Sequence, residues 1–381
     1  MIYRDFKGEK ISLLAFGAMR LPTKGSDADI DMEKSAELVD YCMKEGVNYY
    51  DTAWGYHSGN SEIAMGEILK KYPRDSFYLA TKFPGYDVNN MGHAKEIFEK
   101  QLEKCQTDHF DFYLIHNVCE VNIDQYLDPK YGDVPFFIEM RKQGKIRHLG
   151  FSCHANFDNM KRFLDAYGKD MEFCQIQLNY IDYKMQDAKK KVDYLNKIGM
   201  PIWVMEPLRG GKLISMTQPY MGRLEKVRPG DDSVKWAFRF LQTLPGVTTI
   251  LSGMSDLEQA KAKVALCQKE EPLSNAEMDA LMSTVDAMLD ENFVPCTACH
   301  YCTPHCTKEL DIPYLIELYN EHKYSKGGFT APMAISLLPE DKRPSACIGC
   351  RKCEKVCPQG IKISEIMKDF VKILAEYPTL N

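Results

Sequence analysis

Short runs of apolar and β-branched residues alternate with longer stretches of helical period through the first 267 residues. Eight runs have the length and composition of buried strands, at residues 13–19, 47–51, 77–82, 110–116, 148–152, 173–179, 202–206 and 248–253. Helical stretches lie between them, at residues 33–45, 94–105, 135–143, 156–166, 188–198, 233–241 and 257–267. This alternation is typical of a parallel sheet built from βαβ units.

Eight such units predict an α/β fold, a (β/α)8 TIM barrel whose reactive groups lie at the carboxyl ends of the strands. A doubly wound sheet is the alternative, but no G-x-G-x-x-G follows the first strand. A further helix at residues 276–289 leads toward a cysteine-rich region. The predicted division is a barrel domain of residues 1–290 and a second domain of residues 291–381.

The second domain contains eight of the fourteen cysteines, in two runs of equal spacing. These are Cys296-x2-Cys299-x2-Cys302-x3-Cys306 and Cys347-x2-Cys350-x2-Cys353-x3-Cys357. In such runs three cysteines bind one 4Fe-4S cluster and the fourth binds the other cluster. The rule assigns to a first cluster Cys296, Cys299, Cys302 and Cys357, and to a second cluster Cys347, Cys350, Cys353 and Cys306. Zinc and disulfides are the alternatives, but neither requires a duplicated triplet.

Helical period continues between the cysteine runs, at residues 312–324 and 334–338, and a last helix is expected at residues 364–376. A small, mostly helical two-cluster ferredoxin-like domain is therefore predicted, with an unrelated helical linker as the alternative. Five lysines lie in or after the second run, at Lys352, Lys355, Lys362, Lys368 and Lys372. They either dock an acidic electron carrier or form a solvated face.

The net charge, the apolar runs and the remaining cysteines indicate which partners and which cell compartment to expect. A formal charge of -6 without a basic tail makes a nucleic-acid partner unexpected. The chain has neither an apolar secretion signal nor an apolar run of membrane-spanning length, so a cytoplasmic protein that does not enter membranes is expected. The six remaining cysteines are scattered, which suits buried thiols in a reducing compartment.

Four polar residues lie at the ends of three consecutive predicted strands or in the loop that follows. Asp51 ends the second strand, Tyr56 lies in its loop, Lys82 ends the third and His116 ends the fourth. A tyrosine needs a neighbouring ammonium to act as an acid near neutral pH, and a carboxylate keeps that ammonium charged. We call these four residues the tetrad; they suit protonation of a carbonyl oxygen while a hydride arrives at carbon.

The chain here resembles the aldo-keto reductase family. The likeness covers about residues 10–267 and depends on DTAWGY at 51–56, TK at 81–82, DFYLIH at 111–116, GFS at 150–152, QIQLNY at 175–180 and PLxGG at 207–211. The resemblance implies that Tyr56 is the general acid, that Lys82 and Asp51 tune it, and that His116 orients the substrate carbonyl. It also implies a nicotinamide cofactor, NADP or NAD, lying across the barrel mouth.

By the same resemblance, Ser152 and Gln177 hold the nicotinamide carboxamide. Further contacts are expected after the seventh strand, from Met205, Pro207, Leu208 and Gly210, and after the eighth, from Ser252 and Gly253. The chain departs from the family pattern at Cys153, where many members have Asn, and at Met205, where many have an aromatic residue. No Lys or Arg lies in residues 250–258, so a preference for NADPH is not implied, and Gly253 is alternatively an ordinary turn glycine.

Hydride transfer moves two electrons, whereas a 4Fe-4S cluster passes one. The clusters are expected to relay electrons between a ferredoxin or other carrier and the barrel cofactor, to serve a separate protein, or only to fold a domain over the barrel mouth. A flavin would reconcile the electron counts; no flavin signature is present, yet flavin phosphate loops vary too much to exclude one. The alternatives to a carbonyl reductase are an electron-transfer protein that uses the barrel as a docking scaffold, and an iron or redox sensor.

Overall fold

Eight parallel strands close into a barrel in the computed structural model, which describes residues 1–119, 122–185, 188–289, 294–324, 330–336 and 338–377. The strands are β3 (Leu14–Gly17), β4 (Tyr49–Asp51), β5 (Tyr78–Phe83), β6 (Phe110–Val118), β7 (Ile146–Cys153), β8 (Cys174–Gln177), β9 (Ile202–Met205) and β10 (Val247–Gly253). All eight predicted strands are confirmed. Pairing of β10 with β3 closes the sheet, so the barrel is confirmed and the doubly wound alternative is wrong.

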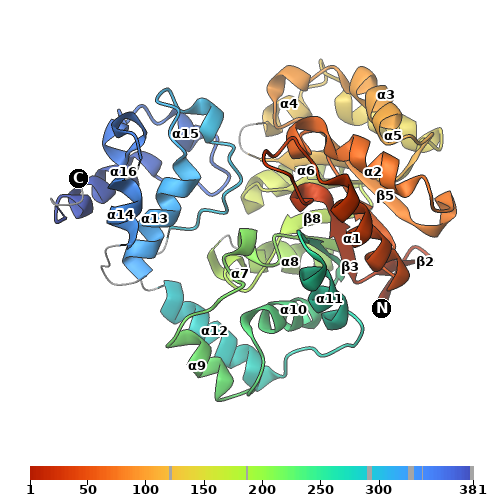
Figure 1. Ribbon diagram of the computed structural model, residues 1–381. Coiled ribbons are helices and arrows are strands. Elements are labelled where there is room, and N and C mark those ends of the chain that lie inside the picture. Colours follow the sequence, from red (N-terminus) through yellow and green to blue (C-terminus); the bar gives the residue numbers. More distant parts are fainter. Residues whose placement is uncertain (120–121, 186–187, 290–293, 325–329, 337, 378–381) are drawn as a thin grey trace. The chain divides into compact units, whose positions relative to one another are not determined.

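Helices follow the strands and surround the barrel (Figure 1). They are α1 (Met32–Lys44), α2 (Ser61–Leu69), α3 (Ala94–Lys104), α4 (Ile123–Leu127), α5 (Asp133–Lys142), α6 (Phe157–Tyr167), α7 (Asp182–Met185), α8 (Ala188–Lys197), α10 (Ser233–Thr243) and α11 (Leu257–Leu266). The sequence pattern missed α2 because seven of its nine residues are buried, which removes the amphipathic period. Its Gly66 is required by packing, since a Cβ there would lie 2.6 Å from the Lys104 carbonyl oxygen.

An antiparallel hairpin that the sequence pattern did not predict precedes the barrel. It consists of β1 (Tyr3–Phe6) and β2 (Glu9–Ser12), joined by Lys7 and Gly8, which both have positive φ angles as a two-residue hairpin turn requires. Phe6 enters the barrel interior, where its ring centroid lies 4.9 Å from that of Trp203. The hairpin thus fills the end where the strands begin and leaves the carboxyl ends for a site.

The chain divides into two compact units. Unit 1 contains Met1–Pro207 and Val234–Leu273, and unit 2 contains Leu208–Ser233 and Ser274–Asn381. The loop that leaves β9 therefore belongs to the cysteine-rich unit, although it interrupts the barrel in sequence. The predicted boundary between residues 290 and 291 lies outside the described residues.

Unit 2 is helical throughout its described part. Its helices are α9 (Tyr220–Glu225), α12 (Asn275–Leu289), α13 (Ile312–Tyr324), α14 (Thr330–Ser336), α15 (Lys352–Lys355) and α16 (Ile363–Leu374). Buried Ile363, Met367, Phe370 and Leu374 form one face of α16 and pack into a core with α13. The mostly helical second domain is confirmed; the helix predicted at 334–338 begins earlier, and residue 337 lies outside the described part.

Short 3-10 turns complete the backbone: η1 (Ala18–Arg20), η2 (Tyr56–Gly59), η3 (Arg74–Ser76), η4 (Val88–Asn90), η5 (Arg209–Gly211), η6 (Thr303–His305), η7 (Glu340–Lys342) and η8 (Pro344–Ala346). In the described ranges, no helix combines the length and the apolar character needed to cross a membrane.

Candidate functional site

The tetrad residues meet at the carboxyl end of the barrel. Asp51 is the last residue of β4, Lys82 lies one residue before the end of β5, and His116 lies near the end of β6. Tyr56 begins η2, five residues after Asp51. The parallel strands therefore bring together the four residues that the sequence singled out.

Lys82 is fully buried and donates to three acceptors. Its Nζ lies 2.5 Å from Asp51 Oδ1, 2.7 Å from the Thr52 carbonyl oxygen and 3.4 Å from the Tyr56 hydroxyl. An ammonium has three N–H donors, so this arrangement uses each of them once. Lys82 thereby joins the carboxylate to the phenol.

Burial and the neighbouring charges set the protonation states of this group. Burial raises the pKa of Tyr56, while the Lys82 ammonium acts in the opposite direction. Burial by itself disfavours charged Lys82, but Asp51 and Tyr56 outweigh it and the pKa of Lys82 is raised. Lys82 is therefore charged and Tyr56 protonated near neutral pH. Lys82 lowers the pKa of Tyr56, as expected from the sequence, but burial raises that pKa by more.

His116 forms the other wall of this site. Its ring lies edge-on to Tyr56 at a centroid distance of 6.4 Å and edge-on to Tyr86 at 5.3 Å. Burial, and then the positive charge of Lys82, hold the pKa of His116 well below its usual range. The imidazole is neutral near pH 7, and the Tyr126 hydroxyl donates to its backbone carbonyl at 2.8 Å.

The loop that carries Tyr56 is held by its neighbour His57, which the sequence pattern did not single out. His57 is buried with a positive φ of 51°, and its Nε2 accepts the Leu21 N–H at 3.1 Å. Its Nδ1 lies 2.8 Å from the Asp27 carbonyl oxygen, so Nδ1 donates and Nε2 accepts. This tautomer ties the Tyr56 loop to the loop after β3.

A buried polar network supports β5 behind Lys82. Glu62 Oε1 accepts from Thr81 Oγ1 and from Gln101 Nε2, both at 2.7 Å. Gln101 Nε2 also donates to the Lys82 carbonyl oxygen at 2.9 Å. Because each partner is buried, the network fixes the backbone from which Lys82 projects.

Ser152 and Gln177 lie at the ends of β7 and β8, where the sequence placed them. Ser152 Oγ accepts the Asn117 N–H at 2.7 Å and keeps its own hydrogen for donation. Gln177 Nε2 donates to Asp182 Oδ2 at 2.7 Å. Cys153 is buried, as are the other five cysteines outside the two runs, which confirms the prediction of buried thiols.

Met205 ends β9, and its sulfur accepts a hydrogen bond from Gln175 Nε2 at 3.7 Å. Pro207 and Leu208 follow and are buried, whereas Gly210 is exposed. Pro207 belongs to unit 1, but Leu208 and Gly210 belong to unit 2. The predicted cofactor contacts of these four residues stay predictions.

Gly253, next to Ser252 at the end of β10, has a basic neighbour that the sequence pattern missed. A Cβ on Gly253 would lie 2.7 Å from Arg20 Cγ, so the glycine makes room for the arginine. Lys263 Nζ donates to the Gly253 carbonyl oxygen at 2.7 Å, and burial lowers the pKa of Lys263 to about 8. Residues 250–258 contain no basic side chain, but Arg20 and Lys263 place two basic side chains beside the end of β10.

The sequence also predicts that Trp54, Phe83, Tyr86 and Asn117 line the substrate pocket at the barrel mouth, but Phe83 does not. It is fully buried, and its ring packs on Phe137 of α5 at 5.2 Å, because alternate residues of a strand point to opposite faces. Lys82 points into the mouth, so Phe83 points into the helix layer. Tyr86 contacts His116, and Trp54 stacks under Lys104 Nζ at 4.0 Å.

A small cavity in unit 2 collects the four cysteines assigned to the first cluster. Cys296, Cys299, Cys302 and Cys357 line it, with Pro313, Ile316 and Ile363 among the other walls. Three of the cysteines come from the first run and one from the second. Four converging thiols are the donor set that a 4Fe-4S cluster requires.

A second small cavity collects the four cysteines assigned to the second cluster. Its cysteines are Cys306, Cys347, Cys350 and Cys353. Ile363 lines both cavities, and Cys350 is the single exposed cysteine of the fourteen, all of which are free thiols. Within the described part no three His, Cys, Asp or Glu side chains meet closely enough to hold one ion, whereas a cubane takes each thiolate at a different iron.

The two cysteine runs share positive φ angles at equivalent positions. Residues two and four positions after the first cysteine have positive φ in each run: Ala298 at 54° and His300 at 61°, then Gly349 at 69° and Arg351 at 59°. Backbone N–H groups point toward the thiols, as from Leu310 to Cys306 Sγ at 3.4 Å. The repeat in sequence is therefore a repeat in structure.

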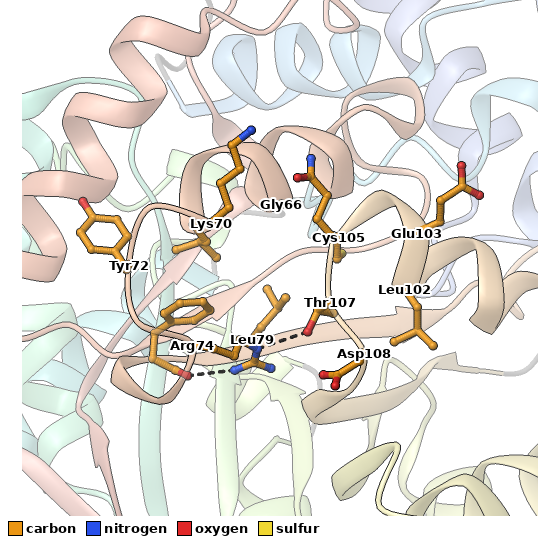
Figure 2. A pocket seen from close by; sticks show the side chains of 13 residues that line it. Gly66, Lys70, Tyr72, Arg74, Leu79, Leu102, Glu103, Cys105, Thr107 and Asp108 are labelled. Atoms are coloured by element: carbon orange, nitrogen blue, oxygen red, sulfur yellow. Dashed lines mark hydrogen bonds between the residues drawn. The ribbon is translucent and has the colours of Figure 1, made fainter.

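A separate cavity of about 550 Å³ lies where β5 and β6 begin, at the opposite end of the strands from the tetrad (Figure 2). Arg74, one of the two basic residues that line it, contacts Thr107 Oγ1 at 3.2 Å, the Phe77 carbonyl oxygen at 3.4 Å and Asp111 Oδ2 at 2.8 Å. None of the predicted site residues lines this cavity.

Comparison with known proteins gives two family matches, each to a different part of the chain. A family model described as "Aldo/keto reductase family" matches residues 13–286, and one described as "4Fe-4S dicluster domain" matches residues 295–361. The NADH-specific methylglyoxal reductase of Escherichia coli is 25% identical over 213 residues, which is 51% of this chain and 63% of that enzyme. This chain therefore spans less than two thirds of that relative.

Solved structures show the same fold. Aldo-keto reductase AKR11C1 from Bacillus halodurans, in its holo form, superposes with a TM-score of 0.62 at 24% identity, covering 74% of this chain and 96% of that one. An aldo-keto reductase from Klebsiella pneumoniae in complex with NADPH gives a TM-score of 0.60 at 17% identity, covering 74% of this chain and 94% of that chain.

Proposed function

Because this chain belongs to the aldo/keto reductase family and contains a 4Fe-4S dicluster domain, we propose that it is a nicotinamide-dependent oxidoreductase that reduces an aldehyde or ketone at the tetrad. The observation that carries the proposal is the buried Lys82 ammonium, which contacts both Asp51 and the Tyr56 hydroxyl. A phenol paired with a fixed positive charge can protonate a carbonyl oxygen, because the charge stabilises the phenolate that is left.

In the proposed reaction, carbonyl carbon gains a hydride with its electron pair and carbonyl oxygen gains the Tyr56 proton. The substrate C=O bond becomes a single bond, and the product is an alcohol. Lys82 stabilises the phenolate that Tyr56 leaves behind, and that phenolate regains its proton from solvent. Neutral His116 donates a hydrogen bond to the substrate oxygen and aligns it with Tyr56.

The chain's own residues suit a nicotinamide dinucleotide, which supplies the hydride when bound. Ser152 keeps a hydroxyl hydrogen for a carboxamide oxygen, and the Gln177 amide lies on the next strand. Arg20 adds a positive charge beside Ser252 and Gly253 at the end of β10, where a dinucleotide phosphate would meet it. Met205, Pro207, Leu208 and Gly210 are proposed to complete the site.

The substrate is proposed to be a small carbonyl compound. Trp54 and Tyr86 are proposed to line the mouth with aromatic surface, and the E. coli relative is named for methylglyoxal. The two cysteine sets are proposed to hold one cluster each, as their cavities group them. A ferredoxin or another acidic carrier is the proposed partner of the second cluster, whose Cys350 is exposed beside Arg351 and Lys352.

The decisive experiment is Tyr56→Phe in the cluster-loaded chain. Loss of the acid is expected to lower carbonyl reduction by about a hundredfold or more, while cluster absorbance stays unchanged. Tyr78→Phe is the matched control, because Tyr78 is a half-buried tyrosine at the opposite end of β5. Equal turnover by the Tyr56→Phe variant and the parent chain would refute the assignment.

The rival candidate is an electron-transfer protein that uses the barrel only as a scaffold. It predicts no binding of a nicotinamide. Titration with NADH and NADPH, followed by quenching of tryptophan fluorescence, separates the two: saturable quenching supports the reductase, and its absence with both dinucleotides supports the scaffold.

A further inference from the structure

The loop that leaves β9 carries two positive charges into unit 2. It opens with η5, in which Arg209, Gly210 and Gly211 have successive positive φ angles of 50°, 63° and 90°. Arginine is unfavourable in this backbone conformation, so the surroundings must hold it there. The Arg209 side chain is fully buried, and Lys212 follows three residues later.

Lys212 is placed near the first cluster cavity by an ion pair. Its Nζ lies 2.7 Å from Glu317 Oε1 on α13. The residue before Glu317 is Ile316, which lines the first cavity together with Cys296 and Cys357. Arg209 and Lys212 both lie close enough to Cys296 for their positive charges to act on it.

A 4Fe-4S cluster held by four thiolates is an anionic group, and its one-electron reduction adds another negative charge. A nearby positive charge stabilises the reduced form more than the oxidised form, and so raises the reduction potential. The effect is larger where the charge is buried, because solvent screens it less. Arg209 meets this condition, and Lys212 is largely buried, with 28% of its side chain exposed.

The second cavity differs in this respect. Its basic lining residues, Lys308 and Arg351, are both exposed, and so are Ile348 and Cys350 at its rim. Exposed charges are screened by water and salt. The two clusters therefore have unequal electrostatic surroundings within one unit.

We propose that Arg209 and Lys212 raise the reduction potential of the first cluster above that of the second, so that electrons entering at the exposed second cluster come to rest beside the loop that leaves β9. The proposal rests on the cluster ligand sets proposed above. It does not depend on the identity of the carbonyl substrate.

The test is an anaerobic redox titration of the full, cluster-loaded chain, followed by absorbance and electron paramagnetic resonance. Two one-electron steps are expected. In Arg209→Gln and in Lys212→Gln the higher step should move downward and the other should stay. At fixed potential the ratio of reduced to oxidised first cluster should fall about tenfold, which is about 59 mV for one electron.

Three further variants separate charge from structure. Arg209→Lys keeps the charge and should keep the potential. Glu317→Gln removes the carboxylate that faces Lys212 and should move the same step upward. Arg223→Gln is the matched control, because Arg223 is an exposed arginine on α9 in the same segment, and it should change neither step.

Cys306→Ser identifies the steps, because it should remove the second cluster and leave the first. The proposal is overturned if both neutral variants leave the titration unchanged in a fully loaded chain, or if the shift falls on the second cluster. If Arg209→Gln does not fold, the test uses the other two variants: the reduction potential of the first cluster should fall in Lys212→Gln and rise in Glu317→Gln, and a chain in which neither moves it overturns the proposal. A chain that binds no iron would instead overturn the ligand assignment, and loss of carbonyl reduction with normal potentials would concern the tetrad alone.

Discussion

The tetrad is held together by contacts between residues that are distant in sequence. Lys82 keeps a charge in a buried position only because Asp51, Thr52 and Tyr56 accept its three hydrogens. A buried ammonium without such partners would lose its proton. The same contacts hold the Tyr56 hydroxyl within reach of that charge.

Arg20 is a residue whose role we expect to show in cofactor binding. Arg20→Gln should raise the Kd for nicotinamide dinucleotides about tenfold, because one charge-assisted contact to a phosphate is lost. The measurement is fluorescence titration with NADH and with NADPH. If Arg20 meets the diphosphate that both share, both Kd values rise alike. Lys24→Gln, an exposed cation in the same loop, is the control, and unchanged binding of both dinucleotides by Arg20→Gln would contradict the role.

The sequence predicted the tetrad because strand ends are visible in the hydrophobic pattern. It did not predict Arg20, since that residue reaches Gly253 through barrel closure, a contact with no local periodicity. His57 and Gln101 were not predicted either, because their contacts also join residues far apart in sequence and leave no local periodicity. The sequence wrongly predicted Phe83 at the substrate pocket, because Phe83 lies near the end of β5 but side chains alternate along that strand and it faces the helices.

Among the elements, the two cysteine runs form an interlocked pair. Each supplies three thiols to one cavity and a fourth to the other, and Ile363 at the start of α16 touches both cavities. The spacing predicted this exchange because, in two-cluster runs of this form, the fourth cysteine binds the other cluster. The hairpin β1–β2 was not predicted, since its strands are short and its turn is Lys-Gly.

Cys306→Ser and Cys299→Ser form a matched pair that tests the exchange. Each should lower the iron content to about half, but the surviving clusters should differ in potential, since Cys306 lines the second cavity although it belongs to the first run. Iron analysis and redox titration provide the measurement. Loss of the same cluster in both variants would mean that each run binds its own cluster.

For the whole molecule, the two units can be followed separately. All three tryptophans, Trp54, Trp203 and Trp236, belong to unit 1. The core of unit 2 includes the cluster cysteines Cys302 and Cys353. Fluorescence therefore reports the barrel, whereas iron binding concerns the other unit.

Removal of iron is expected to unfold much of unit 2 and to spare the barrel, because metal-site binding energy contributes to folding only where the ligands lie. Far-UV circular dichroism should lose helical signal, while the thermal transition seen by tryptophan fluorescence stays near its original temperature. Reconstitution of the clusters should restore the signal. A matching loss of the fluorescence transition would show that the barrel depends on the clusters.

The segment of residues 208–233 has a consequence for the ancestry and engineering of this chain. The polypeptide passes between the two units after residues 207, 233 and 273, so no single cut separates them. Joining a reductase and an iron-sulfur module end to end would give one junction, whereas this chain passes between its two units three times. Transplanting the iron-sulfur module to another barrel would require moving both pieces together.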